Sequence, residues 1–171
     1  RVLIVGNGNG LCAFLTAVLE EIGARPTRID DTADAQTLCR ALTAGRIGAA
    51  VLCGEMGGGG LPERLAATLT LTEEIREAGV PLLMALSDAA VYQSGAGRMS
   101  ETAAVGGRTR EGLEASILQT ALLGAARGLL GDAVRTLLIR HVPILGGQCA
   151  AWCDALLDDR SIQVENPTAR G

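Results

Sequence analysis

Short apolar runs alternate with longer segments of helical periodicity along the chain. Five runs have the length and composition of buried strands, at residues 2–5, 27–29, 48–53, 80–86 and 134–141. Between them, apolar residues recur every three to four positions over residues 11–23, 34–45, 62–79 and 110–130. Parallel strands need a connection of a dozen or more residues, usually a helix. The alternation therefore predicts an α/β fold with a parallel sheet.

Residues typical of helix ends flank these helical segments. Asp34 is a good N-cap residue for the second segment, and Pro62 lies where proline is favoured in a first helical turn. Gly23 and Gly79 follow the last periodic residues of two segments, where glycine favours termination. The stretch GEMGGGG, residues 54–60, follows the third strand, and its composition predicts a flexible loop.

Length and charge restrict the class of protein. The 171 residues, 48% of them apolar, suffice for one compact domain, which we expect to span residues 1–171. The net charge of −4 and the scattered arginines offer no electrostatic footprint for nucleic acid or anionic lipid. No apolar run approaches the roughly 20 residues that span a bilayer, and glycines and asparagines interrupt the N-terminal one. We expect a cytoplasmic protein with neither nucleic-acid nor membrane partners.

Few residue types are available for chemistry. All fifteen basic residues are arginine, so reactions that need lysine are excluded, and Tyr92 and His141 are the single tyrosine and histidine. His141 has no evident carboxylate or cysteine partner in the sequence, which favours a core or rim position over a catalytic one. Cys149 and Cys153 are four residues apart but lack further ligands nearby, so we expect no metal site.

The stretch VLIVGNGNGLCAFL, residues 2–15, reads as a strand, a glycine-rich turn and a helix. Gly6, Gly8 and Gly10 would let the backbone approach a pyrophosphate, and the helix that starts near Leu11 would direct its free N–H groups at the phosphates. The spacing departs from G-x-G-x-x-G, so an ordinary tight turn is the alternative.

The stretch LLMALSDAAVYQ, residues 82–93, ends a buried strand in Ser-X-X-X-Val-Tyr, and SETA follows at 100–103. With the glycine-rich stretch before it and LLIRHVPILGG at 137–147, this order of features resembles the extended short-chain dehydrogenase/reductase family, which includes nucleotide-sugar epimerases and dehydratases. The resemblance covers nearly the whole chain. It implies a Rossmann-like, doubly wound parallel sheet and NAD or NADP as the cofactor.

The catalytic residues depart from that family's pattern. GGRTR, residues 106–110, stands where the family has Tyr-X-X-X-Lys, so Gly106 takes the tyrosine position and Arg110 the lysine position. A register that is shifted to fit the following helix places Arg108 and Gly112 there instead. Neither register supplies a tyrosine. We therefore expect no hydride transfer by the family's mechanism.

Five residues remain as candidates for chemistry on a substrate. Asp88 occupies the position of the family's Ser or Thr, Ser87 precedes it, and Tyr92 belongs to the Ser-X-X-X-Val-Tyr element. Arg108 and Arg110 could grip a phosphate or a carboxylate, with ordinary charges at a helix start as the alternative.

The cofactor region is short. Only PTRIDDTAD, residues 26–34, separates the first helix from the second, so one strand and one helix of the family are expected to be fused or deleted. Asp30 or Asp31 could bind a ribose, or either could belong to a later turn. Two alternatives follow for the cofactor: the chain still binds NAD or NADP, or it has lost this binding. The C-terminal IQVENPTARG lies where the family enters its substrate lobe, so we expect a minimal or truncated form, although Arg1 leaves a trimmed sequence as an alternative.

The helix at 110–130 has more apolar positions than one sheet-facing side needs. With the family's four-helix interface as a guide, it predicts a homodimer, or a heterodimer with an intact relative. Two functions fit these observations. The first is a ligand-binding or partner-supporting pseudoenzyme in a biosynthetic pathway, and the second is a non-redox enzyme that uses Asp88 or its neighbours for acid–base chemistry on a small molecule.

Overall fold

The computed structural model describes residues 1–6, 10–54, 56–88 and 106–141. Strands and helices alternate through these ranges, as the periodicity predicts. The elements are β1 (Val2–Val5), α1 (Gly10–Glu21), β2 (Pro26–Ile29), α2 (Ala35–Thr43), β3 (Ala49–Cys53), α3 (Leu61–Glu77), β4 (Leu82–Asp88), α4 (Arg110–Ala125), a π-helical turn η2 (Ala126–Leu130), a 3₁₀ turn η3 (Gly131–Ala133) and β5 (Arg135–His141).

The described strands form one parallel sheet in the order β2-β1-β3-β4-β5. Val5 at the end of β1 pairs with Ile29 of β2 on one side and with Leu52 of β3 on the other. The chain therefore reverses direction across the sheet after β2, which makes the space between β1 and β3 a topological switch point. A single strand lies beyond β1 in the described residues, in agreement with the predicted loss of one strand and one helix.

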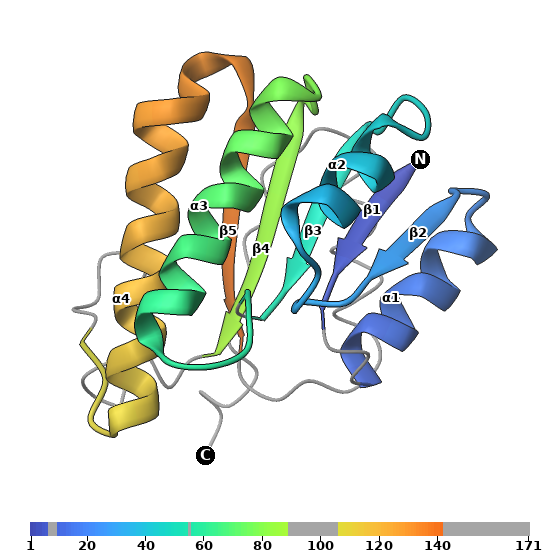
Figure 1. Ribbon diagram of the computed structural model, residues 1–171. Coiled ribbons are helices and arrows are strands. Elements are labelled where there is room, and N and C mark those ends of the chain that lie inside the picture. Colours follow the sequence, from blue (N-terminus) through green and yellow to red (C-terminus); the bar gives the residue numbers. More distant parts are fainter. Residues whose placement is uncertain (7–9, 55, 89–105, 142–171) are drawn as a thin grey trace.

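Helices cover both faces of the sheet, which makes the fold doubly wound. On one face, α1 contributes Cys12, Leu15 and Leu19 to a cluster with residues of β1, β3, β4 and β5. On the opposite face, α2, α3, α4 and the turn η2 pack together against the sheet. The five strands of the described residues point the same way, so their carboxyl ends, and the starts of α1 and α4, lie along one edge (Figure 1).

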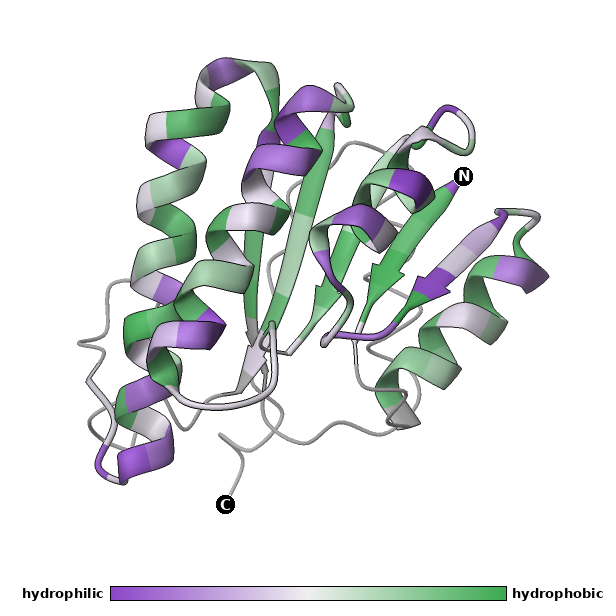
Figure 2. Ribbon diagram, viewed as in Figure 1, coloured by the Kyte–Doolittle hydropathy of each residue, from purple (hydrophilic) through white to green (hydrophobic). Residues whose placement is uncertain are grey.

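Burial differs between the central strands and the edge strand. Every residue of β1 and β3 is buried, because both strands are paired on two sides and covered on two faces. Figure 2 shows these strands in the colours of hydrophobic residues and a hydrophilic segment in β2. Strand β2 begins at Pro26, which lacks an N–H donor, and carries the exposed Arg28. A short edge strand with a proline and a charge is protected against pairing with another chain.

The predicted helix ends agree with the structure. The Asp34 carboxylate accepts a hydrogen bond from the Thr37 N–H at 2.8 Å and caps α2. Gly23 follows α1 with a φ of 83°, a conformation that glycine adopts without strain. Across the described ranges, no helix combines the length and the apolar character needed to cross a bilayer.

The loop after β3 is anchored, which corrects the prediction of flexibility for GEMGGGG. Met56 is 0% exposed and belongs to the core beneath α3 and α4. The Gly57 N–H donates a hydrogen bond of 2.7 Å to the Asp31 carbonyl oxygen in the turn after β2. The glycines give this loop its tight course, but one apolar side chain among them fixes it to the core.

We expect Met56→Ala to lower the free energy of unfolding by about 2–5 kcal/mol, because it removes a fully buried side chain and leaves a cavity. Urea denaturation measures this loss. The control is Ile22→Ala, at a half-exposed residue just after α1, for which we expect about 1 kcal/mol or less. Equal losses in the two variants would show that Met56 does not anchor the loop.

Candidate functional site

The carboxyl edge of the sheet is where open α/β sheets bind ligands, at the switch point above all. Gly6 follows β1 there, and Asp30 to Thr32 follow β2. Gly54 follows β3, while Asp88 and His141 are the last residues of β4 and β5. The candidate site is therefore assembled from the ends of all five described strands.

Gly6 lies in a space that only glycine can occupy. Its N–H donates a hydrogen bond of 3.1 Å to the Ile29 carbonyl oxygen of β2. A Cβ at this position would lie 2.5 Å from Cys12 Sγ and 3.1 Å from the Cys53 carbonyl oxygen. The absence of a side chain therefore lets the start of α1 pack closely on the ends of β1 and β3. Close packing of that kind is one role of the glycines in a dinucleotide-binding turn.

An open crevice of about 250 Å³ lies beside this turn, lined by Gly6, Arg28, Ile29 and Asp30. One oxygen of the Asp30 carboxylate, Oδ1, accepts hydrogen bonds from the Thr32 hydroxyl at 2.5 Å and from the Thr32 N–H at 3.0 Å. These two bonds lower the pKa of Asp30 below its ordinary value, so the group is an ionised acceptor at neutral pH. The predicted pair of Gly6 and Asp30 is thus brought together at one crevice.

Asp31 has a different environment from its neighbour. Partial burial raises the pKa of its carboxyl group, and a hydrogen bond and charge repulsion from Asp30 raise it further. Its carbonyl oxygen holds the Gly57 N–H, so the turn after β2 is tied to the loop after β3. Asp30, which lines the crevice, is therefore the better of the two candidates for a ribose ligand.

The rest of the predicted glycine-rich turn is described in part. Gly10 is the first residue of α1, and Leu11 packs half-buried against the core on the α1 face of the sheet. Gly8 lies outside the described residues. The strand before this stretch and the helix after it agree with the sequence pattern.

Near the end of β4, the Ser87 side chain forms a hydrogen bond within the protein. Its Oγ accepts a hydrogen bond from the buried Gln119 side chain of α4. The two side chains line a cavity of about 20 Å³ that also borders Thr68 and Met56, which is room for one water molecule. Ser87 therefore lies on the α4 face of the sheet. Tyr92, another predicted catalytic residue, lies outside the described residues.

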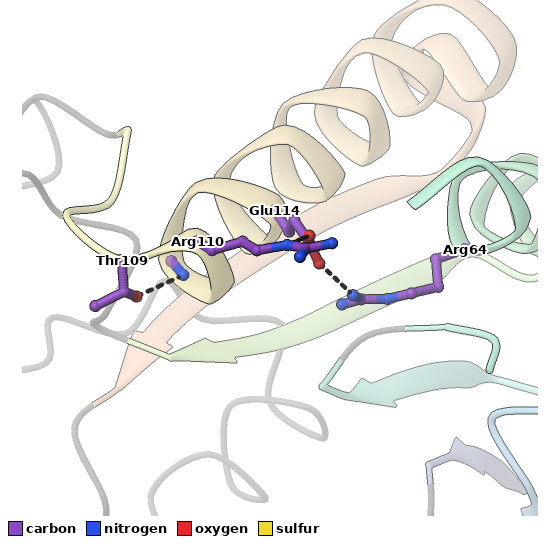
Figure 3. Close-up of polar contacts among 5 residues, drawn as sticks. Arg64, Thr109, Arg110 and Glu114 are labelled. Carbon is purple, nitrogen blue, oxygen red and sulfur yellow. Dashed lines mark hydrogen bonds and ion pairs between the residues drawn. The ribbon is translucent and has the colours of Figure 1, made fainter. Parts of the chain in front are cut away.

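Arg110, at the position of the family's lysine, belongs to an ion-pair network between two helices (Figure 3). Its Nε donates to Glu114 Oε1 at 2.9 Å, one helical turn further along α4. Arg64 of α3 donates from Nη1 to Glu114 Oε2 at 3.2 Å. The hydrogen bond and charge of Glu114 raise the pKa of Arg110. The Nε of this guanidinium is thus occupied within the chain, while Arg108 is exposed beside it.

The entry to α4 is a tight turn that requires glycine at position 107. Gly107 has a φ of 59°, and a Cβ there would lie 2.2 Å from the Gly112 carbonyl carbon. Thr109 caps the helix by accepting a hydrogen bond from the Gly112 N–H at 3.0 Å (Figure 3). The segment that resembles a degenerate Tyr-X-X-X-Lys motif is therefore built as a tight turn and a helix cap.

The strand register adds one relation that the sequence pattern did not reveal. Asp88 and His141 are register partners in the parallel pairing of β4 with β5. Aligning the ends of the two predicted strands is the only signal in the sequence that could have found this pairing. Within the described ranges, no three His, Cys, Asp or Glu side chains are grouped so that they could hold a metal ion.

No protein-family model matches the sequence, and no curated protein is significantly similar to it. Solved structures do match in fold. MoeE5 in complex with UDP-glucose and NAD is 21% identical, with a TM-score of 0.64 over 82% of this chain and 52% of that chain. UDP-glucose 4-epimerase from Brucella ovis in complex with NAD is 15% identical, with a TM-score of 0.67 over 83% of this chain and 52% of that chain.

A short-chain dehydrogenase/reductase superfamily protein from Agrobacterium tumefaciens with bound NAD gives a TM-score of 0.65 at 16% identity, over 82% of this chain and 48% of that chain. The chain spans about half of the length of these structures. NAD is bound in these three structures, and NADP in a matching GDP-L-fucose synthetase from Naegleria fowleri, which is 10% identical with a TM-score of 0.58 over 82% of this chain and 49% of that chain. The chain therefore has the Rossmann-like fold of the NAD-bound epimerases and short-chain dehydrogenase/reductase proteins, as the sequence resemblance predicted.

Proposed function

We propose that this protein binds a dinucleotide, NAD or NADP, at the carboxyl edge of its sheet. The observation that carries the proposal is the open crevice at the β1 end, which joins Gly6, Arg28 and Asp30. The start of α1 lies beside Gly6, so its unpaired N–H groups and positive dipole end would face the phosphates.

Asp30 is the residue that would hold the ribose of the adenosine half. Thr32 engages Oδ1, and the residue is exposed, so a ribose hydroxyl could donate a further hydrogen bond to this carboxylate. An ionised carboxylate repels a 2′-phosphate, which favours NAD over NADP. Arg28, which lines the same crevice, supplies a positive charge that would lessen this preference.

The second part of the proposal is that the chain has lost the family's catalytic tyrosine and lysine. The chain has no lysine, its single tyrosine is Tyr92, and Arg110 pairs with Glu114, so a tyrosine activated by a nearby lysine is not available at the start of α4. We propose a pseudoenzyme of the cytoplasm that binds a dinucleotide or nucleotide sugar and supports a partner in a biosynthetic pathway. The nucleotide-sugar class is suggested by the UDP-glucose that the matching MoeE5 structure contains.

One observation favours a second function, a non-redox enzyme with acid–base chemistry centred on Asp88. The register partner of Asp88 is the single histidine of the chain. A carboxylate and an imidazole on adjacent strand ends are residue types suited to proton transfer near neutral pH.

The assembly proposal rests on an apolar patch on the outer side of α3 and α4. These helices lie side by side (Figure 1). Leu69 of α3 is 43% exposed, and Leu113 and Ile117 of α4 are 48% and 37% exposed. Three large apolar side chains on adjoining helices are typical of a surface that another subunit covers. We infer a homodimer, or a heterodimer with an intact relative, through this patch.

Dinucleotide binding can be tested by calorimetric titration with NAD, NADP and UDP-glucose. We expect NAD to bind, and at one hundred times its Kd to raise the free energy of unfolding by about 2.7 kcal/mol. Gly10→Val should abolish binding, because a branched side chain at the start of α1 blocks close approach of the phosphates. Gly48→Val is the matched control at the opposite edge of the sheet, before β3, and should bind normally. A folded Gly10→Val variant with unchanged affinity would place the ligand elsewhere.

The dimer can be tested by light scattering at micromolar concentration. We expect the wild type to have twice the mass of one chain, and Leu113→Glu combined with Ile117→Glu to give a monomer, because two charges would have to be buried in the interface. The control is Ile22→Glu, at a similarly exposed apolar residue just after α1, and this variant should remain dimeric. A monomeric wild type would contradict the homodimer.

A further inference from the structure

Two cysteines lie against Gly6 at the switch point of the sheet. A Cβ at Gly6 would lie 2.5 Å from the Sγ atom of Cys12 and 3.1 Å from the Cβ atom of Cys53. Both distances are measured from one point, so the Cys12 sulfur and the Cys53 Cβ are no farther apart than the two distances added together. Cys12 belongs to the first turn of α1, and Cys53 is the last residue of β3. Two separate elements thus bring two cysteines to one place beside the crevice.

The two cysteine side chains belong to the same part of the core. Cys12 is 0% exposed and Cys53 is 3% exposed, and both are members of the apolar cluster on the α1 face of the sheet. Both are thiols in this structure. A disulfide joins Cβ atoms that lie about 3.5–4.5 Å apart. Because Gly6 places no side chain between them, a small shift of α1 and a rotation of the cysteine side chains would bring the sulfurs into bonding distance.

The remaining cysteine of the described residues has a different environment. Cys39 is exposed on α2, and that helix packs on the opposite face of the sheet from Cys12 and Cys53. Desolvation and then the negative charge of Glu74 raise the pKa of the Cys39 thiol, which lowers its share of reactive thiolate at neutral pH. Cys39 therefore provides an accessible thiol outside the pair, against which the pair can be compared.

We propose that Cys12 and Cys53 are a redox pair, which hydrogen peroxide closes into a disulfide that ties the start of α1 to the end of β3. In the first step a thiolate sulfur attacks the peroxide, the O–O bond breaks, a sulfenic acid forms, and the hydroxide that leaves takes up the thiol proton. In the second step the other sulfur attacks the sulfenic sulfur, the S–O bond breaks and water leaves. Two thiols and one peroxide thus give one disulfide and two water molecules.

Burial determines how the pair reacts. Buried thiols are slow nucleophiles, and a bulky reagent does not reach them in the folded chain. Hydrogen peroxide is nearly as small as water, so brief local opening of the packing between α1 and the sheet is enough to admit it. Disulfides of cytosolic proteins are usually transient and serve catalysis or redox sensing. A pair that is reduced in the folded chain and closes under an oxidant fits the sensing role.

Closing the pair would change the crevice. Gly6 lines the crevice and packs against both cysteines. Bonded sulfur atoms lie about 2.05 Å apart, much closer than two thiols in contact, so Gly6 and the start of α1 would shift relative to Asp30. This consequence rests on the proposed binding of a dinucleotide, whereas closure of the pair requires no ligand. The two proposals can therefore fail separately.

Peptide mapping tests the pair in the whole chain without ligand. Trypsin cleaves after arginine except before proline, so Cys12 falls in the peptide of residues 2–28 and Cys53 in that of residues 47–64. We expect hydrogen peroxide, followed by alkylation in denaturant, to yield these two peptides linked, and dithiothreitol to separate them. Mass spectrometry identifies the product. Absence of the linked peptide at a peroxide concentration that oxidises Cys39 would overturn the proposal, as would a predominant link from either cysteine to a third one.

Calorimetric titration with NAD tests the effect on the crevice. In the wild type we expect peroxide to raise the Kd by about tenfold, the effect of losing one hydrogen bond to a charged group, and dithiothreitol to restore it. Cys53→Ala cannot close the pair, so its affinity should not change with peroxide. Cys39→Ala is the matched control and should respond as the wild type does.

The two measurements separate the proposals. A linked wild type with an unchanged Kd for NAD would show that closure does not regulate the crevice. If the reduced chain does not bind NAD, the dinucleotide proposal fails, and the peptide map alone decides the pair. If NAD binds and no link forms, the pair fails and the dinucleotide proposal stands.

Discussion

Because β1 is paired with β2 on one edge and with β3 on the other, the chain must cross the sheet in two opposite directions. The connection that follows β1 runs over one face of the sheet and the connection that follows β3 runs over the other, which leaves a gap at the carboxyl end of β1. Gly6 stands at this gap, and the contacts of Cys12 and Cys53 around it bring α1 close to the sheet. The crevice beside Asp30 is a product of this strand order, and the proposed ligand site depends on it.

The loops around the gap are fixed to one another. The hydrogen bond from Gly57 to Asp31 joins the turn after β2 to the loop after β3, and Met56 holds that loop to the core. These contacts connect the packing of α3 and α4 with the position of Asp30. The turn that carries Asp30 is therefore held in place by the same core that stabilises the fold. Thr32 adds two local hydrogen bonds to the Asp30 carboxylate.

The fold could be predicted from the sequence because hydrophobic periodicity reports which faces are buried. VLIV at 2–5 matches β1, and the end residues Asp34 and Gly79 lie where helices begin or stop. The candidate site was harder to predict. The pairing of Asp88 with His141 depends on the relative register of two strands that are separated by more than forty residues, and periodicity carries no information on register. The ion pairs of Glu114 likewise depend on how α3 packs against α4, while Met56 could not be told from its flexible-looking neighbours by composition.

The two arginines that share Glu114 also bear on how such a chain could be re-engineered. Arg110 stands where the resembling family has its lysine, and here it helps hold a carboxylate that Arg64 binds from the other helix. Exchanging it for a lysine would remove the planar guanidinium from that contact, and any side chain at Gly107, in the turn before the helix, would meet backbone atoms of Gly112. Substitutions at this entrance would therefore disturb the contact between two helices, so a designer would have to rebuild the whole entrance of α4.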